Sequence, residues 1–296
     1  MKIRVLITIV LFACFGQLIG QTSDSVKVDI NHIFFCVDSI TYDNLFKHEF
    51  IAKVFANTRE ASSKTLTDSW TGKYLFGRDS YIEVFASNSY KETNPQLGDK
   101  FGDVGIVFKT KKLGDIHKIN LLIKTNKRDT HLKLNEYESD GKIIPFNYNL
   151  YLSNADLQET FRPYVEEKTM DFLKLSGFSE SEIKSGITQE QFAEKFRGKK
   201  FEKLYDNIEK IELILTDEEF EYLAATLKYF GFSQMEHRFT SNGLEIICSI
   251  QQNRKYKLKG IHFTLLNKTE DIKIEVSKNL TFRASGVKAS FQFNYQ

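Results

Sequence analysis

Residues 29–86 read DINHIFFCVDSITYDNLFKHEFIAKVFANTREASSKTLTDSWTGKYLFGRDSYIEVFA, and the rest of the chain is organised around this stretch. Asn31–Val37 is a short apolar run rich in aromatic and β-branched residues, and Asp38-Ser39 behind it is a helix N-cap signal. From Thr41 to Phe55 the apolar residues recur at three- and four-residue spacing. The pattern predicts a strand followed by an amphipathic helix.

The second part of this stretch predicts an antiparallel pair. Trp70–Phe76 and Ser80–Ala86 are strand-like runs, and Gly77-Arg78-Asp79 between them is a glycine-containing hairpin loop. The whole stretch therefore predicts one strand, one helix, and then two or three strands.

Side-chain alternation separates the two faces of these strands. If Ile33 and Phe35 face the helix, then His32 and its alternate neighbours face away from it. The same alternation on the later strands places further side chains on the face away from the helix, so that this face gathers His32, Trp70, Tyr74, Tyr81 and Glu83. We expect an aromatic wall that holds an imidazole and a carboxylate.

The same order of elements recurs twice more along the chain. Residues 101–152 repeat the strand and helix and supply further strands, and we expect them to pair with the first unit over residues 29–152. A third copy occupies residues 206–296, where a gapless alignment sets Lys210 over His32. Residues 155–205 are charged and helix-forming, and they predict a helical insertion between the second and third copies.

Residues 1–20 have the features of an export signal. Lys2 and Arg4 precede an apolar segment, and Gly20-Gln21 is a plausible cleavage junction. Acylation at Cys14, as in a lipoprotein, is the alternative, and an uncleaved anchor is a third. We expect an exported protein, periplasmic or secreted, and after cleavage no other stretch is long and apolar enough to span a membrane.

Composition excludes one class of partner. Loss of Lys2 and Arg4 would leave 39 basic residues, from 41, against 39 acidic ones, and no long run carries a single sign. This balance argues against a nucleic-acid-binding surface. Cys36 and Cys248 lie inside predicted strands, where a disulfide and simple burial are both open.

Repeated βαβββ units with a histidine on the first strand and a glutamate on the last resemble the vicinal oxygen chelate superfamily. That superfamily includes glyoxalase I, the bleomycin-resistance proteins and the extradiol dioxygenases. The first unit also resembles a group of uncharacterised exported bacterial proteins through Asn31–Phe35 and Trp70–Gly77. The resemblance implies an α+β fold in which repeated βαβββ units form a glyoxalase-like β-cup, with a helical insertion and a C-terminal α+β unit.

The resemblance also implies a site. In enzymes of the superfamily, paired first and last strands supply His and Glu ligands to a divalent metal, which makes His32 and Glu83 the corresponding pair here. The companion strand 103–108 has no histidine, and a protonated lysine such as Lys210 is a poor metal ligand.

Two functional classes fit the sequence. The first is an exported protein that binds a small-molecule ligand in the aromatic cup without a complete metal site. The alternative is a lyase, isomerase or dioxygenase that depends on a divalent metal. The missing companion ligands favour binding, although each of the five residues also has an ordinary structural role to explain it, in cross-strand packing or on a solvated face.

Overall fold

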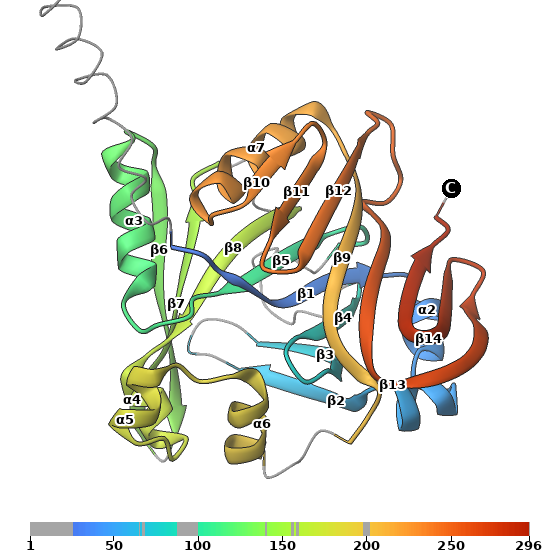
Figure 1. The fold of residues 1–296 in the computed structure, drawn as a ribbon, viewed down its shortest axis with the longest axis horizontal. Helices are drawn as coiled ribbons and strands as arrows, with labels where there is room; N and C mark the ends of the chain where they lie inside the picture. The colour runs from blue at the N-terminus through green and yellow to red at the C-terminus, as the bar shows by residue number, and fades with distance from the viewer. Residues whose placement is uncertain are drawn as a thin grey trace, which may run out of the picture.

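The computed structural model describes residues 26–64, 66, 69–87, 100–139, 141–154, 157, 160–197 and 202–295. The predicted export signal lies outside these residues. The described chain forms two β-sheets, of eight and six strands, with helices against their faces (Figure 1). No helix among these residues reaches the length and hydropathy of a membrane span.

The first unit contains one central strand, helical turns and three more strands. Its elements are β1 (Asp29–Val37), α2 (Ser39–Asn44), the π-helix η1 (Phe50–Phe55), β2 (Asn57–Lys64), β3 (Ser69–Phe76) and β4 (Tyr81–Ala86). β1 is buried over almost its whole length, which explains the apolar run Ile33–Val37. The predicted single helix is two pieces, and Val54 is exposed whereas Ile51 and Phe55 are buried, because the wider π-helical turn shifts the buried face.

The second unit repeats this order with a regular helix. Its elements are β5 (Val104–Lys109), α3 (Asp115–Thr125), β6 (Thr130–Ser139), β7 (Lys142–Leu152) and β8 (Phe161–Lys168). β8 lies in the segment predicted to be helical. Phe161 and Val165 are buried, and polar side chains lie between and after them. The strand therefore lacks the apolar run by which a buried strand is recognised in sequence.

The strand order shows that both units have the same topology. The eight-stranded sheet runs β2-β3-β4-β1-β5-β8-β7-β6, so the first strand of each unit pairs in parallel with its fourth. β1 and β5 pair antiparallel and join the two units at the centre of the sheet. Leu66 N donates to Glu136 O, which brings the two ends of the curved sheet together without closing a barrel. The predicted α+β fold, with repeated units that form a cup, is confirmed.

The third unit forms the second sheet. Its elements are β9 (Tyr205–Leu215), α7 (Asp217–Tyr229), β10 (Ser233–Met235), β11 (Arg238–Ser241) and β12 (Leu244–Ile250), followed by β13 (Leu258–Ser277) and β14 (Leu280–Phe293). β9 pairs in parallel with β12 and antiparallel with β13, as β1 does with β4 and β5. β13 is one long strand, which stays continuous through several register shifts against β14.

Three short helices follow β8 and precede the third unit. These are α4 (Met170–Leu175), α5 (Glu180–Ser185) and α6 (Gln189–Arg197), and in Figure 1 they lie together at one end of the eight-stranded sheet. Leu173, Phe178 and Ile183 form a small core of their own. The predicted helical segment therefore starts after β8, and it packs as a separate cap.

The main core lies between the two sheets. The face of β1 that carries Ile33 and Phe35 shares one apolar cluster with β9, β13, α3 and α7. Phe55 stacks on Tyr205 with ring centroids 5.2 Å apart and also contacts Phe263 edge-on, which joins the first unit to the second sheet. Because this core occupies the outer face of the cup, the opposite face remains for the site.

Asp38 fastens the start of the first unit to the end of the chain. Its carboxylate accepts hydrogen bonds from Thr41 N at 2.9 Å, Tyr295 Oη at 2.8 Å and Asn279 Nδ2 at 3.1 Å. The residue is the N-cap of α2, as its position before Ser39 predicts. One side chain thus caps a helix and holds the two sheets together.

Candidate functional site

The concave face of the eight-stranded sheet lines a cavity of about 900 Å³. Every strand of that sheet contributes to its wall, and α4, α5 and α6 cover part of it. The five residues predicted from alternation all line this cavity, namely His32, Trp70, Tyr74, Tyr81 and Glu83. That they bind a ligand or a metal stays a prediction.

A central row of side chains crosses the floor of the cup. His32 is in register with Tyr81 on one side and with Val107 on the other, and the row continues to Phe76 and Tyr164. The imidazole of His32 stacks on the Tyr81 ring, with centroids 4.3 Å apart and planes at 21°. This row gives the cavity a flat aromatic floor.

Two further rows flank the central one and are related by the repeat. On one side Arg59, Tyr74 and Glu83 are successive cross-strand neighbours. On the other side the corresponding residues are Lys133, Asn149 and Glu166. Each row therefore runs from a cation to a carboxylate, but the first places a tyrosine between them and the second an asparagine.

The two halves of the cup differ in chemistry, because Tyr74 in the first row corresponds to Asn149 in the second. The first unit supplies an aromatic wall, in which Trp70 Nε1 donates to Tyr74 Oη at 2.9 Å and Tyr74 stacks on Phe76 at 5.8 Å. The second unit supplies a polar wall, where Asn135 Nδ2 donates to Asn147 Oδ1 at 3.0 Å. A ligand that fills the cup meets an apolar side and a hydrogen-bonding side.

His32 is neutral in this environment. The side chain is only 4% exposed, and burial lowers the pKa of His32 from 6.5 to about 3, against a smaller opposing effect of Glu166. Within the described part of the chain, nothing hydrogen-bonds Nδ1 of His32. A buried ring nitrogen without a partner is costly, so this atom is available to a bound molecule.

Glu166 is buried but well satisfied. Asn31 Nδ2 donates to it at 2.5 Å and Asn147 Nδ2 at 2.8 Å, and Lys168 Nζ lies 3.3 Å away. Burial acts to raise the pKa of Glu166, but Lys168, His32 and the Asn147 hydrogen bond outweigh it and hold the pKa below its ordinary value. Glu166 therefore stays ionised at neutral pH.

The sequence prediction missed Glu166 and the whole polar wall. The signal was present as a repeat, because Tyr164-Val165-Glu166 in β8 matches Tyr81-Ile82-Glu83 in β4 and has the same register against its partner strand. This repeat was missed because residues 155–205 were interpreted as helical.

The residues at the cup floor do not match the metal set that the resemblance implied. Four positions would supply it, and they are occupied by His32, Glu83, Val107 and Glu166. Valine has no donor atom, and the oxygens of Glu166 already accept from two amides and face Lys168. No group of three His, Cys, Asp or Glu side chains in the described ranges is arranged to hold a metal ion. A three-ligand centre does not fit this site.

The structure describes two of the cysteines, Cys36 and Cys248. Cys36 faces the cup side of β1, in a small apolar cluster with Phe34, Phe85 and Val107, and Cys248 lies in β12. Both are buried, and no disulfide joins them. Burial also raises the pKa of Cys248 to about 12, which keeps it a thiol.

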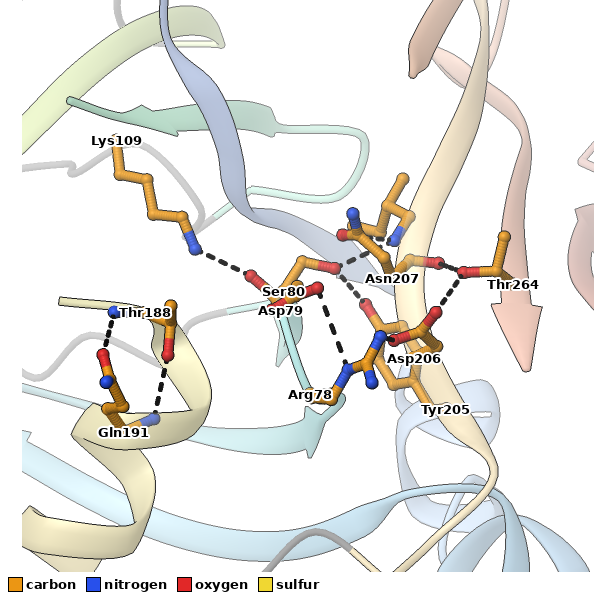
Figure 2. A network of polar contacts seen from close by, with 11 residues as sticks. Arg78, Asp79, Ser80, Lys109, Thr188, Gln191, Tyr205, Asp206, Asn207 and Thr264 are labelled. Carbon is orange, nitrogen blue, oxygen red and sulfur yellow. Dashed lines mark hydrogen bonds and ion pairs between the residues drawn. The ribbon is translucent and has the colours of Figure 1, made fainter. Parts of the chain in front are cut away.

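A turn between β3 and β4 anchors the cup to the second sheet (Figure 2). Arg78 Nη2 lies 2.8 Å from Asp206 Oδ1, and Ser80 Oγ accepts from Ile208 N at 2.9 Å. From the cup side, Lys109 Nζ donates to the backbone oxygen of Asp79 at 2.9 Å. The same turn that contacts the second sheet therefore also positions Lys109 in the cavity wall.

Comparison with known proteins places the chain in a family. A family model described as a family of unknown function, DUF5829, matches residues 30–293. The chain belongs to this family. The matched residues include both sheets and the cup. No curated protein matches the sequence.

Solved structures similar to the chain include a hypothetical protein from Staphylococcus aureus. It has 13% sequence identity and a TM-score of 0.52, with 83% of this chain and 95% of that chain covered, and it shows a shared fold. A Mn(II)-bound glyoxalase from Novosphingobium aromaticivorans has 10% identity, a TM-score of 0.42 and coverage of 92% and 86%. Homoprotocatechuate 2,3-dioxygenase from Arthrobacter globiformis has 9% identity, a TM-score of 0.36 and coverage of 76% and 61%.

Proposed function

We propose that the protein binds a small organic molecule in the cup, in an exported compartment, without a metal ion. The observation that supports this most is the cavity of about 900 Å³, whose aromatic and polar walls come from different units. Small-molecule sites are usually concave and apolar, with a few placed polar groups that fix orientation. His32, with its buried and unpartnered nitrogen, is such a group.

The first test is to identify what the protein carries. Protein exported by its own host is analysed by mass spectrometry under native conditions and again after denaturation, and released compounds are identified. Trp70 is the single tryptophan of the chain and lines the cavity, so its fluorescence reports occupancy directly. We expect a released compound to change this fluorescence on re-addition, and an unchanged signal with every released compound would contradict binding in the cup.

Metal-dependent catalysis is the second candidate, and the repeated Tyr-x-Glu positions favour it. Glu83 and Glu166 occupy equivalent places in the two units, as paired ligands do in the superfamily that the chain resembles. Elemental analysis after dialysis, followed by titration with Mn²⁺, Fe²⁺ and Zn²⁺, separates the two proposals. Stoichiometric metal that is lost in both Glu83→Gln and Glu166→Gln would replace the binding proposal with the catalytic one.

A further inference from the structure

Four asparagines among the described residues line the cavity, and the amides of three of them are bound to the protein itself. Asn135 Nδ2 donates to Asn147 Oδ1 at 3.0 Å, and Asn147 Nδ2 donates in turn to Glu166 at 2.8 Å. Asn31 Nδ2 donates to the same carboxylate at 2.5 Å. Because an ionised carboxylate only accepts hydrogen bonds, it fixes the direction of these amides. The polar wall is therefore ordered by its own contacts.

Asn149 is the fourth of these asparagines, and it differs from the others. It lies two residues after Asn147 on β7 and in register with Glu166 on β8. Its Oδ1 is buried and has no hydrogen-bond partner in the part of the chain that the structure describes. A buried carbonyl oxygen is costly to leave unpaired, so this atom needs an explanation that the fold itself does not supply.

The charges that surround Asn149 are compensated within the cavity wall. Lys168 Nζ lies 3.3 Å from Glu166 Oε1, and Lys111 Nζ lies 3.2 Å from Asp29 Oδ1. These two cations already have anionic neighbours, so they do not call for a charged ligand. The open hydrogen-bonding group of this wall is a neutral amide.

We propose that Asn149 recognises the edge of a flat, uncharged ligand that carries an N–H group beside a C=O group, as in a lactam, a cyclic imide or a pyrimidine base. A carboxamide offers an acceptor and a donor side by side, so it can pair with such an edge through two hydrogen bonds at once. The last torsion of an asparagine side chain is soft, which lets Oδ1 turn toward a molecule in the cavity.

The rest of the cup suits the flat part of such a ligand. The stacked rings of His32 and Tyr81 form the floor, and Trp70 and Tyr74 stand in the wall of the first unit. Aromatic side chains of this kind pack well against a planar ring. The inference rests on the proposed function and names the ligand class for that same site.

The binding test compares probes that differ at one position. 2-Quinolone is a flat bicyclic lactam, and coumarin has the same shape and carbonyl group but a ring oxygen in place of the N–H. Isothermal titration calorimetry with the purified protein gives each dissociation constant. We expect 2-quinolone to bind at least tenfold more tightly than coumarin, because the ring oxygen of coumarin cannot donate to Asn149 Oδ1. 2-Naphthoate, an anion of similar size, should also bind at least tenfold more weakly than 2-quinolone.

Two substitutions on the same strand separate recognition from a structural role. Asn149→Leu has a similar branched shape and removes the unpaired oxygen. It should raise the melting temperature of the ligand-free protein by about 2 °C or more and abolish the preference for 2-quinolone over coumarin. Asn147→Leu is the matched control, since it removes the hydrogen bonds to Asn135 and Glu166 and should lower the melting temperature.

The results that contradict the inference are equally definite. Equal affinity for 2-quinolone and coumarin, no binding of 2-quinolone, or a preference that survives in Asn149→Leu would overturn it. A lower melting temperature of Asn149→Leu would show that Asn149 has a structural partner, and would overturn it as well. A compound released from the exported protein that changes Trp70 fluorescence on re-addition but has no such edge would also sink this inference, while the proposed binding function would stand.

Discussion

Replacing His32 with phenylalanine should remove a defined part of the pH dependence of stability. The imidazole is buried, and its pKa lies near 3 in the folded protein instead of 6.5. Between these values the unfolded chain binds a proton that the folded chain does not bind, so the contribution of His32 to stability is complete above pH 6.5 and is lost as the pH falls.

The magnitude follows from the difference between the two pKa values. One pKa unit corresponds to about 1.4 kcal/mol. Relative to pH 7, the free energy of unfolding of the wild-type protein should therefore fall by about 2 kcal/mol at pH 5 and by about 3 kcal/mol at pH 4 through this one group. Phenylalanine fills a similar volume, can stack on Tyr81, and does not titrate. The free energy of unfolding of the His32→Phe variant should therefore be closest to that of the wild type at neutral pH. It should rise steadily relative to the wild-type value as the pH falls.

Urea unfolding followed by circular dichroism at pH 7, 6, 5 and 4.5 measures this difference directly. All other titrating groups occur in both proteins, so their contributions cancel to first order in the comparison. Tyr81→Phe is the matched control, because it keeps the ring that stacks on His32 and should keep the wild-type slope. Parallel pH profiles for wild type and His32→Phe would refute the reasoning and show that the imidazole is not held neutral by burial.

Three further outcomes are expected. Asp38→Ala should lower the free energy of unfolding by about 2 kcal/mol at pH 7, because it removes a helix cap and the hydrogen bond from Tyr295. Burial acts to raise the pKa of Asp38, but hydrogen bonds hold it at about 2, so this difference should shrink by about half at pH 3, and an equal difference at both pH values would contradict the assignment. Gly105→Ala should cost about 2 kcal/mol or more, since an added Cβ would come within 2.0 Å of the Phe34 ring, and a double-mutant cycle with Phe34→Ala should recover most of the loss. Intact-mass analysis of the exported protein should show that residues 1–20 are absent, and retention of Met1 would refute cleavage.

Local pattern was enough to predict the repeated unit and one wall of the site. The change from a short apolar run in β1 to helical spacing after Asp38 marks the first boundary, because the period of a helix follows from backbone geometry alone. Alternation also places His32 and Glu83 on strands that line the cavity, since consecutive side chains of a strand point to opposite faces. These inferences need no knowledge of which strands become neighbours.

The other wall depended on pairing between distant strands. The antiparallel pairing of β1 with β5 sets Val107 beside His32, and β8 then brings Glu166 into the same cavity, across 134 residues of sequence from 32 to 166. No local signal specifies such a partner, because register is fixed by the shared core and by the other strands of the sheet. β8 also escaped prediction for a physical reason: Arg162, Glu166 and Lys168 line the cavity and are charged, and this polarity removed the apolar alternation by which a strand is recognised in sequence.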